Sequence, residues 1–304
     1  MVNINGPEGN NILGSFAEDE IEAFFSNFLK WNLLYKNFDE TFLEVESEND
    51  EIRGFDFLYQ LYEPFDKDYK NHGIIIESKK IADTAIFNKS RLSKDIQTLK
   101  HKIEKAQTSK RLHDDEKIRN NEIHYFRYGI LCYRFKEFDF NKYNKVLKEY
   151  QINNKSRGSN FPVIFVLSND RLSTFIHLMN LVDDNKSIEY LYPPYKANGW
   201  ENWDEKLSLF YLFSDIIPFK ADNKTNILSF DKPSVNSFNF IQEFCKKYLP
   251  AISSITMARG EYDQISVYKQ YKVEFDETVD KILELDVLNN EMNCSTDLTK
   301  VFKK

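Results

Sequence analysis

An acidic and a basic side chain, two residues apart at the end of a very apolar segment, are the first indication of chemistry in this 304-residue sequence. Glu77 and Lys79 follow the segment Gly73-Ile-Ile-Ile and are separated by Ser78. Side chains alternate between the two faces of a strand, so Glu77 and Lys79 share a face if residues 73–79 form one. Charges at the edge of a core are costly unless they meet each other, a metal or a substrate. This segment is therefore the first candidate for a reactive site.

A lone acid on the preceding segment supports this interpretation. Asp56 lies between Phe55 and Phe57 within residues 52–62, whose many aromatic side chains are typical of a strand. The pattern Asp/Glu-x-Lys occurs five more times in the sequence, but only Glu77 follows an uninterrupted apolar segment. The alternative is that Glu77 and Lys79 form an ordinary surface ion pair, worth about 0–1 kcal/mol.

Hydrophobic spacing predicts the elements that must position these residues. Three successive isoleucines at 74–76 indicate a central strand that is covered on both faces. Apolar residues at helical spacing predict a helix over residues 90–107 with one face directed at the sheet. The result is a mixed α/β layered fold. The expected order is a helix at 16–29, strands at 33–42, 52–62 and 73–79, the helix at 90–107, a strand at 128–135, a helix at 141–150 and a strand at 161–168.

The segment Gly54-Phe-Asp56, followed by Ile75-Ile-Glu77-Ser-Lys79, resembles the PD-(D/E)xK, or restriction-endonuclease-like, nuclease superfamily. The order of helix, three strands, helix and strand is similar to the αβββαβ mixed-sheet core of that superfamily. The resemblance covers roughly residues 14–168. We therefore expect a flexible tail at residues 1–13, a nuclease-like domain at 14–186, and an α-rich C-terminal part at 187–304 that recognises substrate or a partner. In that part, helices are expected at 237–249 and 275–288, and residues 207–217 are ambiguous between helix and strand.

The resemblance implies phosphodiester hydrolysis that depends on Mg²⁺, with Mn²⁺ as an alternative ion. Asp56 and Glu77 would hold the metal, helped by the backbone carbonyl of Ser78, and Lys79 would orient the attacking water and offset charge on the phosphate. Glu18 on the first helix corresponds to an accessory metal-site acid of many members. Its alternative role is a capping box with Ser15.

The region beside this motif is strongly basic. Residues 79–111 contain ten lysines and arginines against three acids, although the whole chain carries a formal net charge of −7. Such a concentration is the expected footprint of a phosphate backbone, and the alternative is a solvated helix face. Gln97 matches a glutamine of some RecB-like members, but His101 stands where those members have tyrosine. The predicted nucleic-acid-binding residues are Lys80, Lys89, Arg91, Lys94, Gln97 and Lys100.

Composition excludes several other classes of protein. The three cysteines form no CxxC pair, which argues against a zinc knuckle or a disulfide framework and favours the reducing cytoplasm. The N-terminal segment has no apolar stretch typical of a signal peptide, and the apolar runs are too short to span a bilayer. No glycine-rich phosphate loop is present, so ATP hydrolysis is not indicated.

The sequence thus favours a metal-dependent nuclease with DNA as the preferred substrate, in bacterial defence, repair or a mobile element. A second protein subunit or a second copy of the chain is an expected further partner, and no membrane is. The alternative function is a catalytically silent nuclease fold that binds DNA or acts as a scaffold subunit.

Overall fold

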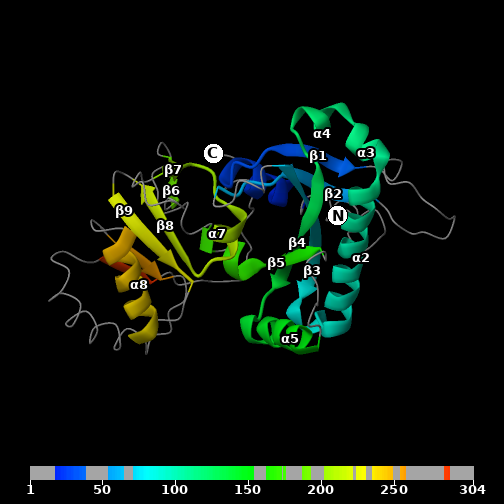
Figure 1. Ribbon diagram of the computed structural model, residues 1–304. Helices are drawn as coiled ribbons and strands as arrows, with labels where there is room; N and C mark the ends of the chain where they lie inside the picture. The colour runs from blue at the N-terminus through cyan, green and yellow to red at the C-terminus, as the bar shows by residue number, and fades with distance from the viewer. Residues whose placement is uncertain are drawn as a thin grey trace, which may run out of the picture. The chain divides into compact units, whose positions relative to one another are not determined.

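The computed structural model describes residues 18–38, 54–64, 71–153, 162–172, 174–175, 187–192, 202–221, 224–230, 235–248, 254–257 and 284–287 (Figure 1). The chain divides into two compact units, the first with residues 1–62, 66–173 and 292–304 and the second with residues 63–65 and 174–291. The main boundary follows residue 173, whereas the sequence suggested one near residue 186. The predicted tail at residues 1–13 and the capping residue Ser15 lie outside the described residues. No helix in the described ranges has the length and apolar content that crossing a membrane requires.

The first unit is built on a five-stranded mixed sheet with the order β1-β2-β3-β4-β5. Its first three strands are antiparallel neighbours, and β3, β4 and β5 run parallel. The predicted adjacency of the first three strands is therefore confirmed, and β3 is a central strand as its isoleucines indicated. The strands are β1 (Leu33–Phe38), β2 (Phe55–Gln60), β3 (His72–Asp83), β4 (Tyr125–Glu137) and β5 (Val163–Leu167).

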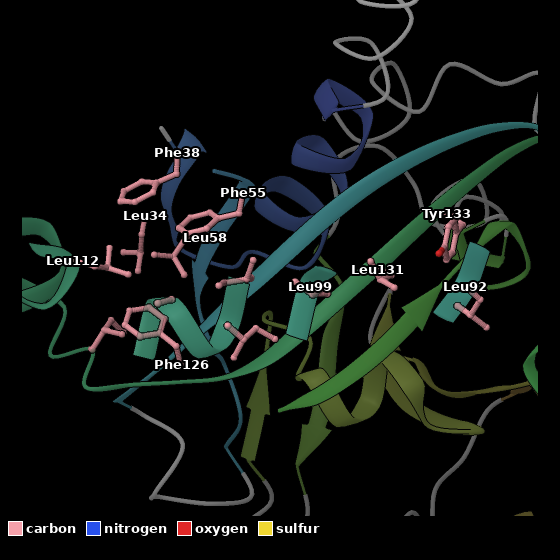
Figure 2. Packing of buried hydrophobic residues seen from close by; sticks show 14 of the residues in the cluster. Leu34, Phe38, Phe55, Leu58, Leu92, Leu99, Leu112, Phe126, Leu131 and Tyr133 are labelled. Atoms are coloured by element: carbon pink, nitrogen blue, oxygen red, sulfur yellow. The ribbon is translucent and has the colours of Figure 1, made fainter. Parts of the chain in front are cut away.

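Helix α2 (Lys89–Thr108) covers one face of this sheet, and a cluster of buried hydrophobic residues lies between them (Figure 1). The helix begins at Asn88, whose side chain accepts a hydrogen bond from the Arg91 backbone N–H at 3.0 Å. Figure 2 shows Leu92 and Leu99 of α2 beside Leu131 and Tyr133 of β4. The apolar stripe predicted over residues 90–107 is thus the face that packs on the sheet.

The same core fixes which side of the sheet carries the candidate site. Ile75 and Ile81 of β3 both belong to the cluster beneath α2. Glu77 and Lys79 lie between them on every second position of the strand. Because side chains alternate between the two faces of a strand, they also face α2. Gly129 of β4 allows α2 to come this close, because a Cβ atom there would lie 2.8 Å from the Ile103 side chain and 2.9 Å from Leu99.

The N-terminal helix packs on the opposite face. It includes the π-helical segment η1 (Ala23–Phe28), and its Phe25 ring contacts Tyr59 of β2 with ring centroids 5.7 Å apart. Glu20 of this helix accepts a hydrogen bond from Nε of Arg134 in β4 at 3.1 Å, and both side chains are largely buried. The ion pair therefore ties the first helix to the central strands.

Replacing Glu20 with Gln is expected to lower the free energy of unfolding by about 2 kcal/mol, because Gln has one acceptor oxygen in place of two and leaves the buried Arg134 without a counter-charge. Chemical denaturation of the two proteins measures this difference. The double variant Glu20→Leu with Arg134→Met is the control, because replacing a buried ion pair by apolar groups is close to neutral. Equal stability of Glu20→Gln and wild type would contradict a role for the pair.

Short helices complete the first unit. Two of them occupy the connection from α2 to β4, where the polar residues His113-Asp-Asp115 by themselves suggest a loop. Side-chain caps explain this, because Ser109 accepts from Leu112 N and Asp115 accepts from Lys117 N at 2.9 Å. These elements are η4 (Thr84–Ile86), α3 (Lys110–Asp114), α4 (Glu116–Asn120) and α5 (Phe140–Asn153).

The second unit contains a six-stranded mixed sheet with the order β11-β10-β9-β8-β6-β7. The expectation of an α-rich C-terminal part is therefore wrong for the described residues, which form six strands and the two helices α7 and α8 there. The helix predicted near residues 237–249 is confirmed as α8, but the helix predicted over 275–288 contains β11. The elements are β6 (Glu189–Tyr192), β7 (Asn202–Asp204), α7 (Leu209–Phe213), β8 (Ile216–Ala221), β9 (Lys224–Ser229), α8 (Val235–Tyr248), β10 (Ser254–Met257) and β11 (Glu284–Val287).

Candidate active site

Strand pairing brings Asp56 next to Glu77. Phe57 of β2 pairs with Ile76 of β3 in antiparallel register. Asp56, which precedes Phe57, therefore lies beside Glu77, which follows Ile76. The backbone N–H of Ser78 donates a hydrogen bond of 2.7 Å to Oδ2 of Asp56. Lys79 Nζ lies 3.3 Å from Oε2 of Glu77. The three residues predicted from the sequence thus converge on the α2 side of the sheet.

The electrostatics of this group follow from its burial. Burial and the neighbouring charge of Glu77 raise the pKa of Asp56 to about 6, although the hydrogen bond from Ser78 and the charge of Lys79 act in the opposite direction. Burial alone lowers the pKa of Lys79, but the carboxylates of Glu77 and Asp56 outweigh it and raise that pKa above its ordinary value. Lys79 is therefore charged at neutral pH, and the two acids repel each other.

A fourth charged residue, Lys102 of α2, joins the group. Its Nζ donates a hydrogen bond of 2.7 Å to Oε1 of Glu77, and only 7% of Lys102 and 2% of Glu77 remain exposed. The sequence interpretation gave Lys102 no role in the site. A signal was present, because position 102 falls three residues after Leu99 and four before Ala106, on the buried stripe of α2. A lysine on such a stripe requires a buried carboxylate, and Glu77 supplies it.

The family model described as "GAPS4 protein PD-(D/E)XK nuclease domain" matches residues 7–171. The chain belongs to this family. No curated protein and no solved structure matches it. The matched range contains all five strands of the first sheet and α2, so the first unit is a PD-(D/E)XK nuclease domain and the resemblance noted in the sequence is confirmed.

In this nuclease domain α2 contributes a second charged residue near the site. Asp95 accepts a hydrogen bond of 2.7 Å from the hydroxyl of Tyr133 in β4, and its negative charge contributes to the raised pKa of Lys79. Asp95, like Lys102, lies on the stripe that faces the sheet, three residues after Leu92. The site is therefore a row of charged side chains between β3 and α2, set within an otherwise apolar interface.

The remaining predicted residues are distributed around this row. Within the described ranges, no three or more His, Cys, Asp and Glu side chains stand close enough together to hold a metal ion, so Glu18 does not join Asp56 and Glu77 here. Its accessory role stays a prediction.

The predicted nucleic-acid-binding residues fall mostly on α2. Lys94 and Gln97 are exposed there, and Lys89, Arg91 and Lys100 are half-buried. Lys80 is exposed on β3, where alternation directs it to the face opposite Glu77. Lys80 is thus separated from the α2 group, and binding by any of these residues stays a prediction.

Proposed function

We propose that this protein is a divalent-metal-dependent nuclease that hydrolyses phosphodiester bonds of nucleic acid, with DNA as the favoured substrate. The observation that carries the proposal is the convergence of Asp56, Glu77 and Lys79 on adjacent strands of a PD-(D/E)XK nuclease domain. In this proposal, the two acids bind the metal and Lys79 acts on the phosphate.

The chemistry of Asp56 and Glu77 fits a hard divalent cation. Mg²⁺ prefers oxygen ligands and keeps several of its waters, so two carboxylates and the backbone carbonyl of Ser78 are sufficient. The raised pKa of Asp56 reflects two buried carboxylates that repel each other, and a cation shared by them relieves this repulsion. A bound Mg²⁺ or Mn²⁺ lowers the pKa of water and stabilises negative charge on phosphate oxygens.

Lys79 provides positive charge where the substrate can reach it. About a third of its side chain, 34%, is exposed, whereas the Glu77 side chain beside it is 3% exposed. A protonated ammonium donates hydrogen bonds to a phosphate oxygen and offsets the charge that develops there in the transition state. Its contact with Glu77 holds this ammonium beside the proposed metal ligands.

The exposed side of α2 supports binding of a phosphate backbone. Lys94 and Gln97 are exposed on this helix, and the half-buried Lys89, Arg91 and Lys100 lie on the same element. A basic helix whose inner face contributes to the candidate site brings phosphate contacts close to the reactive groups.

Replacing both Lys94 and Lys100 with Glu is expected to weaken DNA binding at least tenfold at about 0.1 M salt and to reduce the slope of log K against log salt by about 2. Fluorescence anisotropy over a salt series measures both quantities. The double variant Lys30→Glu with Lys136→Glu is the control, because it changes the net charge equally at exposed lysines outside α2. Equal affinity and slope in the two double variants would identify α2 as a merely solvated face.

We assign substrate or partner recognition to residues 187–304, and the activity as a whole to bacterial defence, repair or a mobile element in the cytoplasm. The chemistry is proposed for the first unit alone, because Asp56, Glu77 and Lys79 lie there. A second subunit or a second copy of the chain is proposed as a further partner.

Incubation of the full chain with supercoiled plasmid, linear duplex DNA, single-stranded DNA and RNA tests the proposal. Each substrate is combined with Mg²⁺, with Mn²⁺ or with a chelator. We expect nicking or cleavage of DNA that requires the metal. Metal binding and DNA binding without cleavage of any substrate would instead favour the catalytically silent DNA-binding or scaffold function.

A further inference from the structure

We propose that Lys102 is an internal counter-cation that occupies Glu77 when no metal is present and competes with the divalent ion for it. Lys102 would thereby set the metal affinity of the site. This inference rests on the proposed function, because it takes Asp56 and Glu77 as the metal ligands.

Glu77 has a cationic partner at each of its two carboxylate oxygens. Lys102 Nζ binds Oε1 at 2.7 Å, and Lys79 Nζ lies 3.3 Å from Oε2, so each carboxylate oxygen already faces an ammonium group. The shorter contact belongs to the more deeply buried lysine. Glu77 therefore has its negative charge compensated by the chain itself.

The charges around Glu77 nearly cancel each other. Asp56 and Glu77 face the ammonium groups of Lys79 and Lys102, and Asp95 adds one further carboxylate near Lys79. Three carboxylates against two ammonium groups leave a small negative charge. A divalent ion that enters this group gains much less attraction than it would from two uncompensated acids.

Distance explains why the ion and Lys102 compete. Mg²⁺ binds oxygen at about 2.1 Å. An ion on Oε1 of Glu77 would therefore lie within about 5 Å of Lys102 Nζ when that nitrogen keeps its 2.7 Å contact, and an ion on Oε2 would lie within about 7 Å of it. Like charges this close in a buried site repel strongly, because little water screens them.

The two lysines differ in their freedom to move away. Lys79 has a side chain that is 34% exposed, so it can turn towards solvent. The Lys102 side chain is 8% exposed, and its neighbours Leu99, Ile103 and Ala106 fix α2 against the sheet. Lys102 thus keeps its positive charge near Glu77 after the ion binds. This retained charge is what lowers the affinity of the site for the divalent ion.

Titration of the metal-free full chain with Mg²⁺ and Mn²⁺ by calorimetry tests the inference. Removing the charge with Lys102→Met or Lys102→Gln is expected to lower the metal Kd about tenfold or more. Lys102→Arg keeps the charge and should keep the affinity near that of wild type. Lys142→Met is the control, since Lys142 lies on α5 and pairs with Asp139 at 3.5 Å instead of with Glu77.

Thermal denaturation provides a readout that is independent of cleavage. In chelator, Lys102→Met should melt at a lower temperature than wild type, because Glu77 is left buried without its closest cation. Added Mg²⁺ should then raise the melting temperature of Lys102→Met more than that of wild type. The Gln variant retains a hydrogen-bond donor for Glu77 and provides a folded protein if the Met variant does not fold.

The failures of the two proposals are distinguishable. If wild type binds metal and the folded Lys102→Met and Lys102→Gln variants bind it equally or more weakly, Lys102 is only a structural partner and the inference is wrong, while the proposed function stands. If folded wild type and folded Lys102 variants all fail to bind metal, the metal site of the proposed function is wrong and the inference falls with it.

Discussion

Replacing Lys79 with Ala is expected to slow metal-dependent DNA cleavage by about 100- to 1,000-fold while metal binding persists. The reason is that Lys79 places an ammonium beside Glu77 without being a metal ligand itself. Replacing Asp56 or Glu77 with Ala should abolish both cleavage and metal binding, because each of these residues supplies carboxylate oxygens. Single-turnover cleavage rates, measured beside calorimetric metal titration, separate the two kinds of loss.

A lysine outside the site provides the control for this experiment. Lys142 of α5 has a side chain that is 62% exposed, so Lys142→Ala removes a positive charge without touching β2, β3 or α2. Its cleavage rate should equal that of wild type. If Lys79→Ala cleaves as fast as Lys142→Ala, the active site lies elsewhere in the chain. If Lys79→Ala also loses metal binding, Lys79 supports the ligands instead of acting on the phosphate.

The central part of the fold was predictable because its signals are local. Three isoleucines followed by Glu-Ser-Lys indicate a buried strand with two charges on one face, and β3 has this form. The apolar stripe of α2 is also a local pattern, and it indicates that this helix covers the face of the sheet that carries Glu77 and Lys79. The closeness of Asp56 and Glu77 then follows from the pairing of neighbouring strands, which the sequence order suggested.

Lys102 and Asp95 were missed for a physical reason. A charged residue on an apolar stripe of a helix is ambiguous until its partner is known. The partners are Glu77 and Tyr133, on two different strands, so the contacts depend on how α2 lies across the sheet. The closeness of α2 to β4 depends in turn on Gly129, and no local pattern in the sequence reports this.

The second unit was harder to predict because its elements are short and depend on one another. Residues 207–217, which were ambiguous between helix and strand, divide into α7 and the start of β8, and Ser208 caps α7 by accepting from Tyr211 N at 3.1 Å. Strand β11 pairs in parallel with β10, a contact that is distant along the chain. Helical spacing over residues 275–288 could not reveal this tertiary pairing.

Replacing Asp56 with Asn is expected to stabilise the metal-free protein by up to about 3 kcal/mol at pH 7 to 8, although it abolishes metal-dependent cleavage. Asn keeps an oxygen that can accept the hydrogen bond from Ser78 N but removes the buried charge that faces Glu77. The pKa of Asp56 rises from its usual 3.8 to about 6 on folding, so the folded state binds the proton more tightly than the unfolded state. Ionisation of Asp56 therefore destabilises the fold.

The sign of this effect fixes its pH dependence. Below about pH 4, Asp56 is protonated in both states and wild type should be nearly as stable as Asp56→Asn. Between about pH 4 and pH 6, wild type should lose stability relative to the variant, and above about pH 6 the difference should stay constant. Chemical denaturation in chelator at pH 4, 5, 6 and 8 measures this profile. If the stability difference between Asp56→Asn and wild type is constant from pH 4 to pH 8, burial and the charge of Glu77 do not raise the pKa of Asp56 on folding. Added Mg²⁺ should stabilise wild type and leave Asp56→Asn unchanged, because only wild type retains both carboxylates that hold the ion.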